Sequence, residues 1–305
     1  MADKAGNQHY EPGDTHTGQL IPVWRSGVES SRTRVELESA DLLPHFNERD
    51  DHAKLEPLKA PSRPPAEVVE WFNRISAGRE RAGCRVLDLG CGKGGTVAWL
   101  LEEGFDAYGL DPSADYVANG RAYLAAERLA VLDGDRYPFP DDFFDAVLSR
   151  QVFEHVADLG QLAREVARVT KRGGVGLHIF PAKWVVVEPH MLTPLVHWFP
   201  KGKSRHRAIG TSLRLGLAGP YFEDRPMSER AAIFSDYGDN NIYYRRLVEI
   251  QRVLGGAGLS VDWRSESARV VRSKLRNPSW PSFLDRVAGW AYYNFRAVCL
   301  TTVKK

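Results

Sequence analysis

Cysteine is scarce in this chain of 305 residues, which contains only Cys84, Cys91 and Cys299. The number is odd, and no two of the three stand at C-x-x-C spacing. The sequence therefore offers neither the cysteine framework of a small disulfide-rich protein nor the paired ligands of a structural zinc site. This cysteine usage fits a reducing compartment, and we predict a cytoplasmic protein.

Long apolar runs and a strong net charge are also lacking. No stretch approaches the roughly 18 consecutive apolar residues of a membrane-spanning helix, and the beginning of the chain has no apolar core typical of a signal peptide. The formal net charge is only +2, which gives no reason to expect a nucleic-acid partner. Hydrophobic residues make up 43% of the chain, so we expect a globular protein with a full core and no membrane span.

The most informative stretch is residues 86–95, V-L-D-L-G-C-G-K-G-G, an apolar run with one acid that ends in glycines. This pattern predicts a buried strand that turns sharply into a helix. Gly90 and Gly92 let the backbone approach a ligand, and the free N–H groups of the helix start add a positive dipole end. Gly90, Gly92 and Gly95 also fit the G-x-G-x-x-G fingerprint, with Asp111 near the offset of a ribose-binding acid, so a nicotinamide oxidoreductase is one alternative.

Asp88 favours a different nucleotide. Residues 88–94, D-L-G-C-G-K-G, resemble motif I of class I S-adenosylmethionine (SAM) methyltransferases, in which this acid organises the site for the methionine end of the cofactor. SAM carries a sulfonium and an ammonium but no phosphate, so an acid beside the loop suits it, whereas the same acid would repel a pyrophosphate. The chain also lacks the Y-x-x-x-K pair of short-chain dehydrogenases.

Three later segments resemble the same family in the same order. Residues 106–113 resemble the second strand, whose acid (Asp111) binds the ribose hydroxyls, and residues 134–136 resemble the turn whose acid (Asp135) accepts a bond from the adenine amino group. Residues 139–156 resemble the fourth strand and its exit in the ubiquinone- and menaquinone-biosynthesis-like type 11 subgroup. The resemblance covers residues 67–182 well and 243–305 loosely. It implies SAM as the cofactor, bound by Asp88, Gly90, Cys91, Gly92, Asp111, Pro112, Asp135, Arg136 and Arg150.

Apolar strand patterns alternate with helical patterns along the chain. We expect strands at residues 85–90, 107–111, 129–133, 146–150, 175–180, 259–264 and 297–303, and helices at 66–79, 96–103, 114–125, 159–171 and 243–255. Such alternation predicts an α/β fold with ligands at the carboxyl ends of the strands. The resemblance adds that the last strand is antiparallel, which gives a doubly wound, Rossmann-like, seven-stranded sheet.

Residues 66–305 are expected to form the methyltransferase domain, and three segments exceed its minimal plan. Residues 1–65 are polar and end in a proline cluster, so they form either a partly disordered tail or a cap over the active site. Residues 183–241 follow the fifth strand and predict a lid that binds substrate. Residues 267–296 predict a helix with one apolar face, suited to the core or to a homodimer contact.

His155 is the first candidate for a catalytic base. It follows the fourth strand by a few residues, and imidazole titrates near neutral pH, so it could take a proton from a hydroxyl. The alternative, given equal weight, is that Glu154-His155 only shapes the turn. His190, in the lid segment, is the second candidate, and it would share a helical face with His197 if Pro194 permits a helix there.

Other polar residues have less specific interpretations. Glu188 and His190 could line the substrate pocket or join His155 around a metal, but Glu-x-His is too short a signal, so we predict no metal site. His178 lies in a strand that should be buried and is predicted to be a hydrogen-bonded core histidine. The basic run at residues 201–207 is either a solvated loop or a site for an acidic or lipid-like substrate.

The absence of certain motifs excludes some classes of methyl acceptor. Residues 149–151, S-R-Q, carry neither the Asn/Asp-Pro-Pro-aromatic motif of DNA amino-methyltransferases nor an acid that would seat magnesium as in catechol-type enzymes, and the chain has no Pro-Cys dipeptide. We therefore predict a SAM-dependent methyltransferase that acts on a small molecule, with O-methylation of a hydroxyl as the preferred reaction. The alternatives are C- or N-methylation by proximity, an NAD(P)-dependent oxidoreductase and a non-catalytic SAM-binding scaffold.

Overall fold

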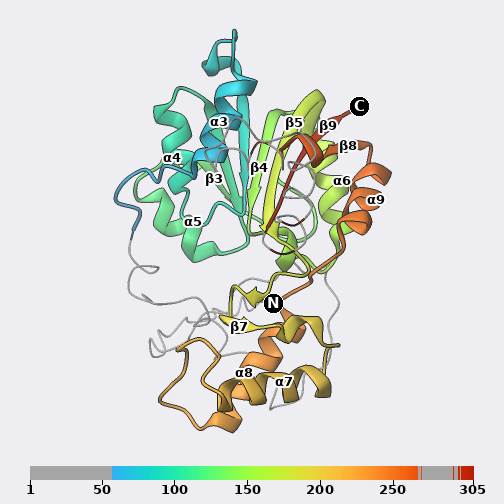
Figure 1. The fold of residues 1–305 in the computed structure, drawn as a ribbon. Helices are drawn as coiled ribbons and strands as arrows, with labels where there is room; N and C mark the ends of the chain where they lie inside the picture. The colour runs from blue at the N-terminus through green and yellow to red at the C-terminus, as the bar shows by residue number, and fades with distance from the viewer. Residues whose placement is uncertain (1–56, 267–268, 270–290, 292–294, 296) are drawn as a thin grey trace, which may run out of the picture.

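A computed structural model of the chain describes residues 57–266, 269, 291, 295 and 297–305 (Figure 1). The helix expected within residues 267–296 and nearly all of the N-terminal extension lie outside the described residues. Among the helices of the described part, none is both long enough and apolar enough to cross a membrane.

The centre of the fold is a seven-stranded sheet with the order β3-β2-β1-β4-β5-β9-β8. β1 pairs in parallel with β2 and β4, and the parallel pairing continues to β3 on one side and β5 on the other. β9 lies between β5 and β8 and runs antiparallel to both. The predicted doubly wound sheet with an antiparallel last strand is confirmed.

Figure 1 shows α4 and α5 beside the β3 end of this sheet and α6 and α9 beside the β8 end. The strands are β1 (Arg85–Leu89), β2 (Asp106–Asp111), β3 (Leu129–Val131), β4 (Phe144–Arg150), β5 (Thr170–Pro181), β6 (Val187–Glu188), β7 (Thr193–Pro194), β8 (Leu259–Asp262) and β9 (Ala297–Lys304). The α-helices are α3 (Ala66–Ile75), α4 (Gly95–Glu102), α5 (Ala114–Arg121), α6 (Leu159–Val169), α7 (Lys203–Arg214), α8 (Met227–Asn240) and α9 (Leu247–Gly256). Short 3-10 helices are η2 (Arg81–Gly83), η3 (Ala126–Arg128), η4 (Phe153–His155) and η5 (Val196–Trp198).

The central strands read as apolar runs because both faces of the sheet are covered. Val86, Leu87 and Leu89 of β1 and Val147 and Leu148 of β4 are fully buried. This continuous core fixes where β1, β2 and β4 end, and their carboxyl ends lie at one edge of the sheet because the strands are parallel. The fold therefore gathers the residues that follow these strands.

Several expected boundaries are wrong. The helix expected at residues 159–171, just before the pair Gly173-Gly174, is shorter: α6 ends at Val169, where the Thr170 hydroxyl donates to the carbonyl of Val166 at 2.6 Å. Both glycines lie inside β5 instead. α3 stops at Ile75 rather than 79, α5 stops at Arg121 rather than 125, and β3 and β8 each end two residues early.

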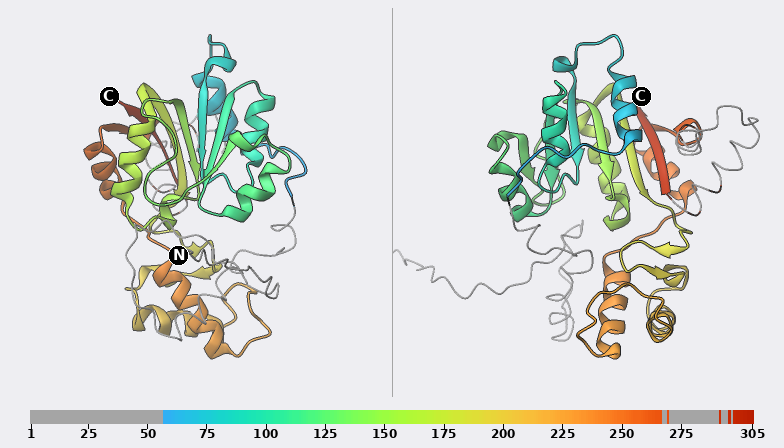
Figure 2. Two further views of the ribbon diagram at one scale, coloured as in Figure 1. Left: turned by 180° about the vertical axis from the view of Figure 1, so that it is seen from behind. Right: turned by 60° about the vertical axis from the view of Figure 1, so that its left-hand side comes forward.

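Residues 183–241, hereafter the insertion, contain β6, β7, η5, α7 and α8. The two views of Figure 2 show them as a lobe on the side of the sheet where β5 ends. The lobe has its own apolar core, which also includes Ile242 just after the insertion; the core residues within it are Met191, Val196, Ile209, Leu213, Ala231, Ile233, Phe234 and Tyr237. A segment so long is seldom structureless inside a compact protein, and this one is folded.

The chain returns from the insertion to the sheet in an extended segment that was expected to be helical. α9 begins at Leu247, not at 243. Tyr243 donates its backbone N–H to the carbonyl of Glu154 at 2.7 Å, and the Arg245 guanidinium donates to the carbonyls of Phe153, Val156 and Ala157. These bonds attach the segment that directly follows the insertion to the turn after β4.

Candidate active site

The glycine-rich turn between β1 and α4 has the geometry that the sequence predicts. Gly90, Gly92 and Gly94 all have positive φ, at 74°, 54° and 78°, a region that favours glycine. A Cβ at Gly90 would lie 2.4 Å from the Cγ2 atom of Val152, whereas a Cβ at Gly92 would meet nothing within 4 Å. The turn therefore packs tightly on one side and leaves open space beside Gly92 for a ligand.

Asp111 ends β2 directly beside this turn. One carboxylate oxygen accepts from the backbone N–H of Gly92 at 2.8 Å, and the other accepts from that of Ser113 at 2.9 Å, across Pro112. Asp111 is buried, and burial raises its pKa although the two backbone bonds act in the opposite direction. Each oxygen retains a further lone pair, so Asp111 can still accept from a ribose diol.

Asp88 is almost fully buried at the end of β1, and burial raises its pKa to about 7, with Arg150 opposing and Asp111 adding to the shift. Arg150 ends β4 and donates weakly to the Thr96 hydroxyl at 3.4 Å, while its buried Nε has no hydrogen-bond partner among the described residues. The next residue, Gln151, has a φ of 56°, which is strained for a side chain of its kind. A buried donor without a partner, such as the Nε of Arg150, next to a strained residue is typical of a ligand-binding site.

The other expected cofactor residues differ in their surroundings. The Cys91 side chain packs against β2, since a Cβ at Gly109 would lie 2.6 Å from its Sγ, and burial raises the pKa of the thiol. Asp135 and Arg136 are exposed on the loop after β3, where the Gln161 side chain donates to the Asp135 carbonyl at 2.9 Å. The Asp135 carboxylate is thus accessible to a ligand that lies along the edge of the sheet.

Residues 57–65 of the expected extension also reach this turn. The backbone N–H of Ser62 donates to the carbonyl of Gly95 at 2.9 Å, and that of Leu58 donates to the carbonyl of Asn119 at 3.0 Å. The open space at Gly92, the acids Asp88 and Asp111 and this covering segment fit a cationic nucleoside such as SAM.

A second polar cluster lies where the insertion meets the turn after β4. Glu154 and His155 belong to η4, and His190 follows β6 in the insertion. The two imidazole rings have centroids 4.8 Å apart and are nearly perpendicular. The Nδ1 of His155 bonds to the carbonyl of Asn241 at 3.0 Å, and the Nδ1 of His190 bonds to the carboxylate of Glu188 at 2.6 Å.

Glu188 is fully buried and accepts from several donors, whereas Glu154 is equally buried and accepts from none. The Tyr244 hydroxyl and the backbone N–H groups of His190 and Met191 complete the partners of Glu188. Neither carboxylate oxygen of Glu154 has a hydrogen-bond partner in the described part of the chain.

These environments set the charges of the cluster. Burial raises the pKa of Glu154 to about 7, although His190 acts in the opposite direction. Burial lowers the pKa of His155 to about 3, and the positive charge on His190 adds to this. For Glu188 and His190 burial opposes the charged forms, but their ion pair outweighs it, so the pKa of Glu188 is lowered and that of His190 is raised. His155 is therefore neutral at physiological pH and does not titrate near 7 as expected.

The structure corrects the sequence analysis of the remaining histidines. His190 and His197 do not share a helical face, because Pro194 lies in β7 and Leu195 has a φ of 60°. His197 packs instead on Tyr244, with ring centroids 4.8 Å apart. His178 is a hydrogen-bonded core residue as predicted: its Nδ1 lies 2.8 Å from the Ser149 hydroxyl and its Nε2 lies 3.2 Å from that of Thr302.

The basic run at residues 201–207 makes most of its described contacts within the insertion. Arg205 is buried, forms an ion pair with Asp239 at 2.9 Å and donates to the carbonyl of Gly238 at 2.7 Å. Lys201 donates to the carbonyl of Asp239. Lys203, His206 and Arg207 line a shallow pocket whose other walls include Asp236 and Asp239, and these acids offset its positive charge.

Comparison with known proteins agrees with this geometry. Residues 87–177, from β1 into β5, match the model of the type 11 methyltransferase domain family. The part of the chain from β1 into β5 is therefore similar to methyltransferase domains. It is 30% identical over 138 residues to methyltransferase GfsG of Streptomyces halstedii, covering 43% of this chain and 48% of that one. It is 36% identical over 99 residues to a ubiquinone biosynthesis O-methyltransferase of Rhodopseudomonas palustris, covering 31% and 38%.

Among solved structures, the chain is similar to a SAM-dependent methyltransferase from Mesorhizobium loti, with 18% identity, a TM-score of 0.45 and coverage of 77% of this chain and 97% of that one. The sequence matches span less than half the length of the curated relatives named above. The match to the family model ends at residue 177, before the insertion begins.

Proposed function

We propose that the chain transfers the methyl group of SAM to a hydroxyl oxygen of a small molecule. The observation that carries this proposal is the position of two sites along one edge of the sheet. The cofactor residues Asp88 and Asp111 end β1 and β2, and the polar cluster of Glu154 and His155 follows β4, which is the other neighbour of β1. Methyl transfer is an in-line displacement, so the protein's main task is to hold donor and acceptor together at such an edge.

We propose the following roles for the cofactor residues. Asp111 accepts from the ribose hydroxyls, Asp88 faces the cationic methionine end, and the Arg150 guanidinium, whose Nε lacks a partner within the described residues, binds the methionine carboxylate. Gly90, Cys91, Gly92 and Pro112 shape the turn, and the exposed Asp135 and Arg136 border the adenine. These roles follow from charge, since the cofactor has one carboxylate, one ammonium and one sulfonium group.

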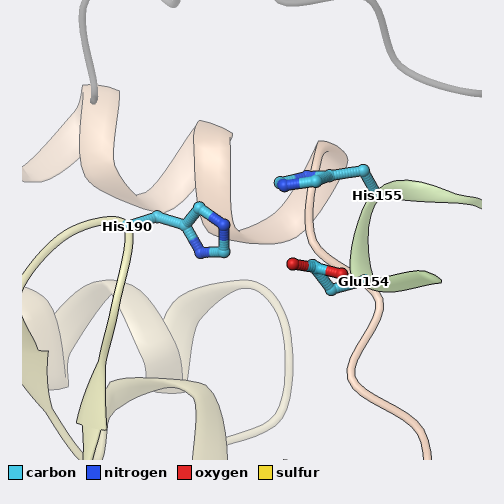
Figure 3. Close-up of side chains that lie close together, drawn as sticks. All are labelled: Glu154, His155 and His190. Carbon is cyan, nitrogen blue, oxygen red and sulfur yellow. The ribbon is translucent and has the colours of Figure 1, made fainter. Parts of the chain in front are cut away.

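The insertion supplies the other wall of the proposed acceptor site, as a lid would. His190 comes from the insertion and His155 from the sheet edge, and their rings lie edge to face (Figure 3). Because the Asn241 carbonyl can only accept, the Nδ1 of His155 carries the proton and the lone pair is on its Nε2. In the metal-free protein His155 is thus the candidate proton acceptor for the hydroxyl, with the Glu154 carboxylate beside it.

The test is methyl transfer from labelled SAM to a panel of phenols and other small hydroxyl compounds. His155→Ala should lower kcat by the low end of the roughly 10²–10⁴-fold range for a lost general base, because a pKa of about 3 makes His155 a weak base, and it should leave SAM affinity nearly unchanged. His206→Ala, on the exposed face of α7, is the matched control and should keep wild-type turnover. Reduced turnover in His190→Ala alone would assign the base to the insertion.

If neither histidine variant reduces turnover, the histidine base is excluded. Transfer by proximity to an amine or carbanion then replaces hydroxyl methylation as the reaction. Binding of SAM without turnover of any acceptor would instead support a regulatory scaffold.

A further inference from the structure

The side chains of Glu154, His155 and His190 converge on one point between the sheet and the insertion. Each offers one potential ligand atom, and these atoms all lie within 4.8 Å of one another. Figure 3 shows the three side chains pointing toward a common space, with Glu154 and His155 from the turn after β4 and His190 from the loop after β6. Residues from two separate parts of the fold thus form a single set of two imidazoles and one carboxylate.

Both imidazoles are oriented by a hydrogen bond to Nδ1. The partner of His155 is the carbonyl of Asn241, and the partner of His190 is the carboxylate of Glu188. Both partners are acceptors, so each Nδ1 carries a proton and each Nε2 has its lone pair available. Histidine ligands of metals are held in this way, with the second ring nitrogen bonded to a carboxylate or a backbone carbonyl.

Glu154 provides the independent second observation. Its side chain is 2% exposed, and neither oxygen has a hydrogen-bond partner within the described residues. A buried carboxylate without donors is costly in free energy, and buried charges are normally paired or coordinate a metal. Glu188 cannot serve in its place, because its oxygens already accept from His190, Met191 and Tyr244.

We propose that Glu154, His155 and His190 bind one divalent transition-metal ion through a carboxylate oxygen and the two Nε2 atoms. Two imidazoles and one carboxylate suit Zn²⁺, Fe²⁺ or Mn²⁺ better than Mg²⁺, which prefers oxygen ligands throughout. Ligands about 2.1 Å from a shared ion lie at most about 4.2 Å apart. The ligand atoms therefore need to move together by a fraction of an ångström, which small side-chain rotations allow.

The proposed ion would join the insertion to the turn after β4 and retain at least one open coordination position. At that position it could bind the acceptor oxygen of the proposed methyl transfer and lower the pKa of the hydroxyl, as catalytic metals do for bound water. His155 would then be a ligand and not a base. Metal binding itself does not depend on the proposed function, since the three ligands need no cofactor.

The experiment uses the full-length, untagged chain, freed of metal with a chelator and titrated calorimetrically with Zn²⁺. Wild type should bind one equivalent tightly, and binding of Co²⁺ should give the visible absorption of a site with nitrogen and oxygen ligands. His155→Ala and Glu154→Gln should each weaken this binding at least 100-fold. His206→Ala should bind as wild type does, and Mg²⁺ should not compete at equal concentration.

Glu188→Gln tests the role of the residue that orients His190. It touches no ion, so we expect 10–100-fold weaker binding and a shifted Co²⁺ spectrum while the chain stays folded by circular dichroism. Glu154→Gln preserves side-chain volume and keeps the test valid if an alanine variant fails to fold.

Absence of a stoichiometric Zn²⁺ site in wild type, or equal affinity in wild type and Glu154→Gln, would overturn the proposal. SAM affinity, measured in the same chelator-treated protein, is expected to be unchanged. Loss of the metal site and loss of the proposed methyltransferase function are therefore separate outcomes.

Discussion

Replacing Glu154 with glutamine should stabilise the metal-free protein at neutral and alkaline pH. Glu154 is buried without hydrogen-bond donors, and burial raises its pKa from 4.5 to about 7. The folded state therefore retains a proton that the unfolded chain loses between these two pH values. Stability from this group is present below about pH 4.5 and is lost as pH rises toward 7. Glutamine has nearly the same shape and cannot ionise, so the variant escapes this loss.

The magnitude follows from the pKa difference. One pKa unit corresponds to about 1.4 kcal/mol, so a rise of about 2.5 units costs the folded state about 3 kcal/mol once both states are ionised. Between pH 5 and pH 8 the unfolding free energy of Glu154→Gln should rise relative to wild type by about 2 to 3 kcal/mol. Comparing the two proteins at each pH cancels the titration of groups that they share.

The assay is urea unfolding followed by circular dichroism at several pH values in the presence of a chelator. Glu165→Gln on α6 is the opposite control: burial disfavours its charge, but the bond to Arg168 outweighs this and lowers the pKa of Glu165. The stability that Glu165 supplies in wild type is present above pH 4.5 and is lost as pH falls below it, so Glu165→Gln should be less stable than wild type by a constant amount above pH 4.5 and approach wild type in more acidic solution. A stability difference for Glu154→Gln that does not change with pH would refute the reasoning.

Three further predictions concern the cofactor residues. Asp111→Ala should weaken SAM binding strongly in calorimetry, because it removes the proposed bonds to two ribose hydroxyls, and near-normal affinity in a folded variant would exclude this role. Asp135→Ala should weaken SAM binding only modestly, because it removes the one proposed adenine contact. SAM affinity should fall as pH drops below about 7, by at most tenfold per unit, because protonation removes the negative charge of Asp88; a flat profile would contradict this. Gly90→Ala should abolish SAM binding or folding, because the new Cβ would lie 2.4 Å from a side-chain carbon and φ is 74°. Gly83 has open space around it, so Gly83→Ala is the control and should match wild type in thermal unfolding and in SAM calorimetry.

The sheet and its glycine-rich turn could be predicted because local sequence determines them. A parallel strand covered on both faces must be apolar along its length, and a turn with positive φ favours glycine. The strand β1 and the turn at Gly90 could therefore be recognised from the local sequence pattern. The end of α6 was harder to predict. Two glycines after a helix normally indicate its end, yet here Thr170 caps the last turn and the glycines extend β5.

The polar cluster could be predicted only in part. His155 and His190 stood out as titratable residues near expected functional segments, but Glu154 and Asn241 did not. Their roles depend on how the insertion packs against the turn after β4, which no local spacing encodes. Glu188 was expected near the site, but its function, holding the Nδ1 of His190, became visible only once the partners of both carboxylates were known.

Calorimetric titration of the full chain with SAM, S-adenosylhomocysteine and NAD⁺ in parallel tests the central claim most directly. One saturable site for SAM and its demethylated product, with no heat of binding for NAD⁺, is the result that the acids Asp88 and Asp111 beside the glycine-rich turn predict. Binding of NAD⁺ in preference to SAM would contradict the account, because it would mean that the turn accepts a pyrophosphate next to Asp88.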